Sequence, residues 1–104
     1  QKPAAACLAS RIAWGVPITA ERLRQVERAE EIVRSFCPPH TQIRVRHHGA
    51  LARIETPPSA LPILAAPETA ARIAPAVLAL GFSFVALDLS GYRMGSLNTL
   101  QEDG

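Results

Sequence analysis

The residues best suited to chemistry lie close together near the start of the chain, in the run Cys7-Leu8-Ala9-Ser10-Arg11. A cysteine reacts as its thiolate, which nearby positive charge stabilises, so Arg11 is placed to favour the reactive form of Cys7. Ser10 and Arg11 are also suited to bind a phosphate or carboxylate through charge-assisted hydrogen bonds. We therefore predict that Cys7 performs the chemistry and that the rest of the domain positions an anionic ligand against it. On the residues alone, a Cys7 that packs as a small hydrophobic side chain is an equal alternative.

A second group of charged residues lies in segment 42–56, which has the alternating pattern of a β-hairpin that turns near Gly49-Ala50. Alternation places Ile43, Val45, Ala52 and Ile54 on an apolar face, and Arg44, Arg46, His48, Arg53 and Glu55 on a polar face. Like charges at this spacing repel each other unless a negative group neutralises them. The pattern predicts an anion site that includes Arg44 and Arg46, with a solvated strand face as the equal alternative.

A helix is expected to precede the hairpin, with Thr19 as its N-cap and Phe36 near its end. Glu30 falls on the apolar stripe of this helix, where a carboxylate is costly unless it is paired, so we expect an arginine to meet it. Cys37 lies on the same stripe and is expected to pack in the interior.

After the hairpin, the sequence predicts a short helix at 59–66 and a second helix from Pro67 that Pro75 kinks or splits. The apolar segment 84–89 is expected to be a central strand. Its one charge, Asp88, is either a structural acceptor or an arginine partner. The loop 90–96 follows, with Arg93 and two glycines. This order of elements indicates an α+β fold, with a small, mainly antiparallel sheet and two or three helices packed on it.

Composition limits the class of protein. The chain has 104 residues, of which 48% are hydrophobic, so residues 1–104 fit a single folded domain. A net charge of +2 does not favour a nucleic-acid partner, and the apolar stretches, broken by Pro62 and Pro75, are too short to span a membrane. Two cysteines make no disulfide framework, which favours the cytoplasm. No metal site is expected, because His47 and His48 point to opposite faces of a strand.

Several motifs, in order along the chain, resemble the carboxyl-terminal half of the LarE family. They are Cys7-Leu8-Ala9-Ser10-Arg11, Gln25-Val26-Glu27-Arg28-Ala29-Glu30, Arg44-Val45-Arg46-His47-His48-Gly49, Leu51-Ala52-Arg53-Ile54-Glu55 and Leu87-Asp88-Leu89-Ser90-Gly91-Tyr92-Arg93-Met94-Gly95-Ser96. Members of that family are ATP-dependent sacrificial sulfur transferases of the PP-loop (adenine nucleotide alpha hydrolase) superfamily. They serve the nickel-pincer nucleotide cofactor of lactate racemase.

The resemblance implies a reaction. An amino-terminal PP-loop domain would bind ATP and magnesium and adenylate a pyridinium dicarboxylic acid mononucleotide. Cys7 would attack the adenylate and then give up its sulfur, leaving a thiocarboxylate on the substrate and dehydroalanine in the protein. Because this sequence has no ATP loop and opens on Gln1, we expect it to be an inactive piece of a longer enzyme.

The resemblance also implies roles for the charged residues. Ser10, Arg44 and Arg46 would bind the substrate phosphate, and Glu30, Glu55 and Arg93 would line the site. The family packs as a homo-oligomer, commonly a hexamer. Some relatives hold an iron–sulfur cluster on three cysteines, but Cys7 is the only candidate here, which favours the sacrificial mechanism.

The sequence departs from the family pattern at Ala13-Trp14-Gly15, where the family usually has Pro-Tyr-Gly. We expect Trp14 to pack against the protein rather than to stack on a ligand. Two alternative functions stay open. One is a non-catalytic anion-binding or subunit-contact module, and the other is a redox switch formed by Cys7 and Cys37.

Overall fold

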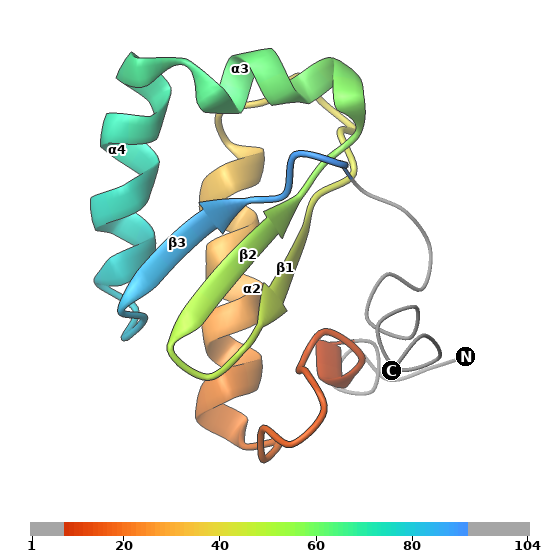
Figure 1. Cartoon of the computed structure of the whole chain (residues 1–104), viewed down its shortest axis with the longest axis vertical. Coiled ribbons are helices and arrows are strands. Elements are labelled where there is room, and N and C mark those ends of the chain that lie inside the picture. Colours follow the sequence, from red (N-terminus) through yellow and green to blue (C-terminus); the bar gives the residue numbers. More distant parts are fainter. Residues whose placement is uncertain (1–7, 92–104) are drawn as a thin grey trace.

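The computed structural model describes residues 8–91, which form a three-stranded sheet with helices packed on it (Figure 1). The helices are α2 (Ala20–Arg34), α3 (Leu61–Ala65) and α4 (Pro67–Leu78), with a short 3-10 helix η1 at Pro58–Ala60. The strands β1 (Arg44–His47), β2 (Leu51–Glu55) and β3 (Phe84–Leu87) lie in the order β1-β2-β3. The predicted α+β class is confirmed.

Helix α2 begins where the sequence predicts and ends two residues earlier, at Arg34. The side-chain oxygen of Thr19 accepts the backbone N–H of Arg22 at 3.1 Å, as expected of an N-cap. The buried stripe of the helix consists of Val26, Ala29, Glu30 and Val33. Because this stripe faces the sheet, the helix must bring the carboxylate of Glu30 next to β1.

Strands β1 and β2 form the predicted antiparallel hairpin, and Gly49 takes a φ of +78° at its turn. The register pairs Arg46 with Arg53 and Arg44 with Glu55. Alternation then gives the sheet two faces. The inner face packs against α2 and α4 and carries Val45, His47, Ala52, Ile54, Val85 and Leu87. The outer face carries Arg44, Arg46, Arg53, Glu55, Phe84 and Ala86.

Strand β3 lies at an edge of the sheet and runs parallel to β2, so the prediction of a central strand was wrong. The chain returns from β2 to β3 through η1, α3 and α4, and such a helical crossover joins parallel strands. The apolar residues of segment 84–89 are therefore only partly buried: Phe84 is 64% exposed and Leu89 is 84% exposed. The register leaves Asp88 just beyond β3, with its N–H donated to the carbonyl of Ile54 at 2.8 Å.

Helix α4 continues through Pro75 to Leu78, so the proline does not split it, and the kink stays a prediction. Because proline has no backbone N–H, Pro75 cannot donate a hydrogen bond to the carbonyl of Ala71. Both residues are exposed to solvent, so water can donate to that carbonyl instead. No single helix among residues 8–91 is long and apolar enough to cross a membrane. Segments Pro58–Ala65 and Pro67–Leu78 reach that length and composition only together, and they meet at an angle of 86°.

The segment before α2 lies along the free edge of β1. Ile12 is buried and forms a parallel bridge with His47. The His47 N–H donates to the Arg11 carbonyl at 2.8 Å, and the Ala13 N–H donates to the His47 carbonyl at 2.9 Å. These bonds place Ser10 and Arg11 beside the hairpin, although they are distant from it in sequence.

Candidate functional site

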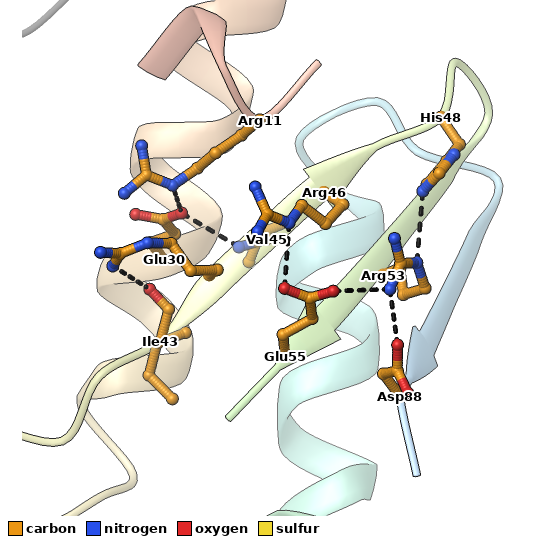
Figure 2. Close-up of polar contacts among 10 residues, drawn as sticks. Arg11, Glu30, Ile43, Val45, Arg46, His48, Arg53, Glu55 and Asp88 are labelled. Carbon is orange, nitrogen blue, oxygen red and sulfur yellow. Dashed lines mark hydrogen bonds and ion pairs between the residues drawn. The ribbon is translucent and has the colours of Figure 1, made fainter. Parts of the chain in front are cut away.

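Arg11 and Glu30 form a buried ion pair at the edge of β1 (Figure 2). Arg11 Nε lies 2.6 Å from Glu30 Oε2, and the two side chains are only 11% and 5% exposed. The same oxygen accepts the backbone N–H of Val45 at 3.0 Å. The expectation that Glu30 meets an arginine is confirmed, and its carboxylate links α2, β1 and the segment that follows Cys7.

The charge of Glu30 depends on these partners. Burial raises the pKa of Glu30 above its ordinary value, against the opposing effects of the Val45 N–H and of the charges on Arg11, Arg44 and Arg34. Removal of a cationic partner would therefore favour the protonated carboxyl.

Glu55 lies on the outer face between two arginines, and it is fully buried. Its Oε1 accepts from Arg46 Nε at 2.9 Å, and its Oε2 accepts from Arg53 Nη1 at 2.7 Å. One buried carboxylate therefore offsets part of the repulsion that the Arg46–Arg53 cross-strand pair would otherwise suffer.

Arg53 has two further partners. Its Nη1 lies 2.5 Å from Asp88 Oδ2, and its Nε donates to His48 Nε2 at 3.3 Å. Figure 2 shows the resulting row of side chains that crosses the sheet from Arg46 through Glu55 and Arg53 to Asp88. Burial lowers the pKa of His48, as do the charges of Arg53 and Arg46, so the imidazole is neutral and able to accept.

Among residues 8–91, the contacts of Arg46 hold its side chain at one atom. Its contact with Glu55 uses Nε, and its two terminal nitrogens make no hydrogen bond or ion pair with residues 8–91. A guanidinium fixed through Nε presents these two nitrogens as a fork, which is the geometry that binds a phosphate or carboxylate through two oxygens. This fork is the strongest sign of an anion site in the described part of the chain.

The structure gathers most of the predicted site residues around β1. Arg11 and Glu30 lie at its edge, Arg44 and Arg46 come from its outer face, and Glu55 comes from its partner strand. Arg44 Nη1 donates to the carbonyl of Ile43 at 3.2 Å. Ser10, next to Arg11, is exposed. Cys7 and Arg93 lie outside the described residues.

The sequence places Arg53 and His48 on the polar face of the hairpin, but neither they nor Asp88 were predicted to be site residues. The signal for Arg53 was present, because an arginine opposite Arg46 in the hairpin demands a shared counter-charge. Asp88 was left between two roles and has both: it pairs with Arg53, and its Oδ1 accepts the Ser90 N–H at 2.9 Å.

His47 and Trp14 lie apart from this cluster. His47 is buried on the inner face, where its Nε2 lies 2.7 Å from Gln25 Oε1 and its Nδ1 accepts the Gly49 N–H at 3.1 Å. It is therefore a structural, neutral histidine. Trp14 is 75% exposed, so the prediction that it packs against this chain was wrong.

The remaining features of residues 8–91 do not suggest a metal or a large apolar ligand at the arginines. No three His, Cys, Asp or Glu side chains in this range gather as metal ligands. An apolar cavity of about 110 Å³ lies between α4 and β3, lined by residues such as Ile73 and Leu87. None of the arginines of the anion site lines it, so it does not serve that site.

Comparisons with known proteins show which sequences this chain resembles. No protein-family model matches the chain. It is 40% identical over 97 residues to an uncharacterized protein of Synechocystis sp.. It is 35% identical over 97 residues to the pyridinium-3,5-bisthiocarboxylic acid mononucleotide synthase of Lactiplantibacillus plantarum. Each alignment covers 93% of this chain but only 35% and 34% of the relative, so the chain spans about a third of their length. The second match supports the resemblance to the LarE family.

Proposed function

We propose that this chain is the substrate-binding and sulfur-donating part of a LarE-type sulfur transferase that makes pyridinium-3,5-bisthiocarboxylic acid mononucleotide. The similarity to the Lactiplantibacillus plantarum synthase supports this proposal, because it extends over nearly the whole chain. The structural observation that carries it is the fork of Arg46, which Glu55 fixes through Nε.

The ligand of this fork is the phosphate of the mononucleotide. A guanidinium binds a phosphate through two parallel hydrogen bonds, which set direction as well as affinity. Arg44 lies on the same face of β1, and Ser10 and Arg11 lie along its edge, so these residues complete the phosphate site. Glu30 and Glu55 hold the arginines in place and Arg93 adds to the lining.

The phosphate site holds the pyridinium carboxylate near Cys7, three residues before Ser10 in the sequence. The thiolate attacks the carboxyl carbon of the adenylated substrate, a carbon–sulfur bond forms and AMP leaves. Loss of the Cys7 α-proton then breaks the bond between Cβ and sulfur. The sulfur stays on the substrate as a thiocarboxylate, and Cys7 becomes dehydroalanine.

Adenylation is assigned to another part of the protein. ATP and magnesium would bind a PP-loop domain, since this chain has no such loop. A cytoplasmic location and assembly as a homo-oligomer are part of the same proposal.

Binding experiments on the complete protein test the phosphate site. Arg46→Ala should weaken binding of pyridinium dicarboxylic acid mononucleotide by about tenfold or more, since a charge-assisted contact is lost. The same substitution should weaken binding of the dephosphorylated nucleoside by less than about twofold. The control, Arg24→Ala, removes an exposed arginine of α2 and should change neither affinity. Equal losses for both ligands in Arg46→Ala would contradict a phosphate role.

A further inference from the structure

On the outer face of the sheet, the side chains of Arg46, Glu55, Arg53 and Asp88 form a cluster of two arginines and two carboxylates. Its arrangement depends on which arginine each oxygen of Glu55 contacts. Oε1 accepts from Arg46 and Oε2 accepts from Arg53. An arginine beside a carboxylate favours a bidentate contact, in which both carboxylate oxygens accept hydrogen bonds from one guanidinium. Some feature of the structure must therefore explain why Arg53 contacts only one oxygen of Glu55.

Asp88 supplies that reason. It lies 2.5 Å from Arg53 Nη1, the same nitrogen that contacts Glu55 at 2.7 Å. Nη1 of Arg53 lies between the carboxylates of Glu55 and Asp88, and its Nε donates to His48. These contacts keep the guanidinium from a bidentate contact with Glu55. The second oxygen of Glu55 is then left for Arg46.

Asp88 is itself fixed before any ligand binds. Its backbone N–H donates to the Ile54 carbonyl at 2.8 Å, and its Oδ1 accepts the Ser90 N–H at 2.9 Å. Its backbone is thus held by β2, and its carboxylate is held by the turn after β3. A residue held at two points can act as a fixed support for Arg53.

We propose that Asp88 is a positioning residue of the anion site: by limiting Arg53 to one oxygen of Glu55, it leaves the other oxygen for Arg46 and so aims the Arg46 fork at the substrate phosphate. This inference rests on the proposed function. It extends the site to β3, through a residue that contacts neither the phosphate nor the reacting atoms.

Asp88→Asn tests the inference in the complete protein, because the amide oxygen still accepts the Ser90 N–H while Arg53 loses one of its two carboxylate partners and keeps Glu55. Two opposite effects separate the alternatives. If Asp88 positions Arg46, mononucleotide binding weakens by about tenfold and nucleoside binding changes less than about twofold. If Asp88 contributes only negative charge, it repels the substrate phosphate, and Asp88→Asn should tighten mononucleotide binding. That result would overturn the inference.

A double-mutant cycle tests whether Asp88 acts through Arg53. In an Arg53→Met background, Asp88→Asn should have no further effect on mononucleotide affinity, because the residue that it holds is absent. A full additional loss in that background would overturn the inference, as would equal weakening of both ligands by Asp88→Asn. The control Glu27→Gln removes one exposed carboxylate of α2 and should change neither affinity.

The outcome distinguishes this inference from the proposed function. If the wild-type protein binds mononucleotide and nucleoside equally, the phosphate site itself is wrong. If the wild type prefers the mononucleotide and Asp88→Asn leaves that preference unchanged, the site stands and only the role of Asp88 is wrong.

Discussion

Glu30 of α2 and Val45 of β1 are joined by a hydrogen bond of 3.0 Å, in which the helix side chain accepts a backbone N–H of the strand. The oxygen that accepts it, Oε2, is also 2.6 Å from Arg11 Nε. One buried carboxylate thus sets the distance between the helix, the strand and the segment that carries the proposed sulfur donor. Glu30 was singled out in the sequence because it lies on the buried stripe of the helix, and these contacts make it part of the candidate site.

The first prediction concerns that carboxylate. Glu30→Gln should lower the free energy of unfolding by about 3 kcal/mol, because it removes the carboxylate that pairs with the buried Arg11 side chain. Glu31→Gln is the control: its side chain is 61% exposed, and its loss should cost less than about 0.5 kcal/mol. Urea denaturation of both variants measures the difference. Similar losses for the two variants would contradict the role given to Glu30.

The second prediction concerns pH. Burial lowers the pKa of His47, and the charges of Arg22 and His48 act in the same direction. The unfolded chain therefore binds a proton before the folded one does. The stability that neutral His47 contributes is complete above its unfolded pKa of about 6.5 and is lost as the pH falls through the lower folded pKa.

Urea midpoints measured from about pH 7 to about pH 5 should therefore decrease, and His47→Gln should reduce that decrease. The glutamine keeps a polar group near Gln25 but has no proton to bind in this range. His48, whose pKa is also lowered, accounts for part of the decrease that remains. An unchanged pH dependence in His47→Gln would contradict the assignment of His47 as a buried neutral histidine.

The third prediction compares two glycines with a positive φ. Gly49 has open space where a Cβ would lie, whereas a Cβ on Gly91 would lie 2.9 Å from the Thr56 carbonyl oxygen. Gly49→Ala should cost about 1 kcal/mol for backbone strain alone. Gly91→Ala should cost at least about 1 kcal/mol more, since the turn after Asp88 must move away from β2. Thermal unfolding of the two variants gives the comparison, and equal costs would show that this turn does not pack as described.

The fourth prediction separates the two cysteines. Burial raises the pKa of the Cys37 thiol, whose Sγ lies 3.7 Å from the Val33 carbonyl, so Cys37 is a poor nucleophile near neutral pH. Cys37→Ala should leave the yield of thiocarboxylate unchanged in the complete protein. Loss of product in this variant, or product formation that depends on a disulfide, would favour a redox switch instead.

The hairpin and the pairing of Glu30 with an arginine could be predicted from the sequence because each depends on a short-range pattern, although the sequence did not identify that arginine as Arg11. Alternation with a period of two residues fixes which side chains share a face, and helical phase places Glu30 among apolar neighbours. The charged composition of the outer face, with Arg46 and Arg53 opposed, followed from the turn at Gly49.

Features that depend on tertiary packing were missed. The apolar residues of segment 84–89 are equally compatible with a central strand and with an edge strand, and only the strand order β1-β2-β3 decides between them. The partner of Asp88 follows from the register of β3 on β2, which no local pattern encodes. Trp14 is large and apolar, but its position on the segment before α2 leaves it exposed.

The most direct test of the account is the mass of Cys7 after one turnover. The complete protein should be incubated with ATP, magnesium and pyridinium dicarboxylic acid mononucleotide, and the peptide that contains Cys7 should be analysed by mass spectrometry. We expect a residue lighter by the elements of hydrogen sulfide, in proportion to the thiocarboxylate formed. An intact thiol at Cys7 after product has formed would contradict sulfur donation and leave a non-catalytic anion-binding module as the alternative.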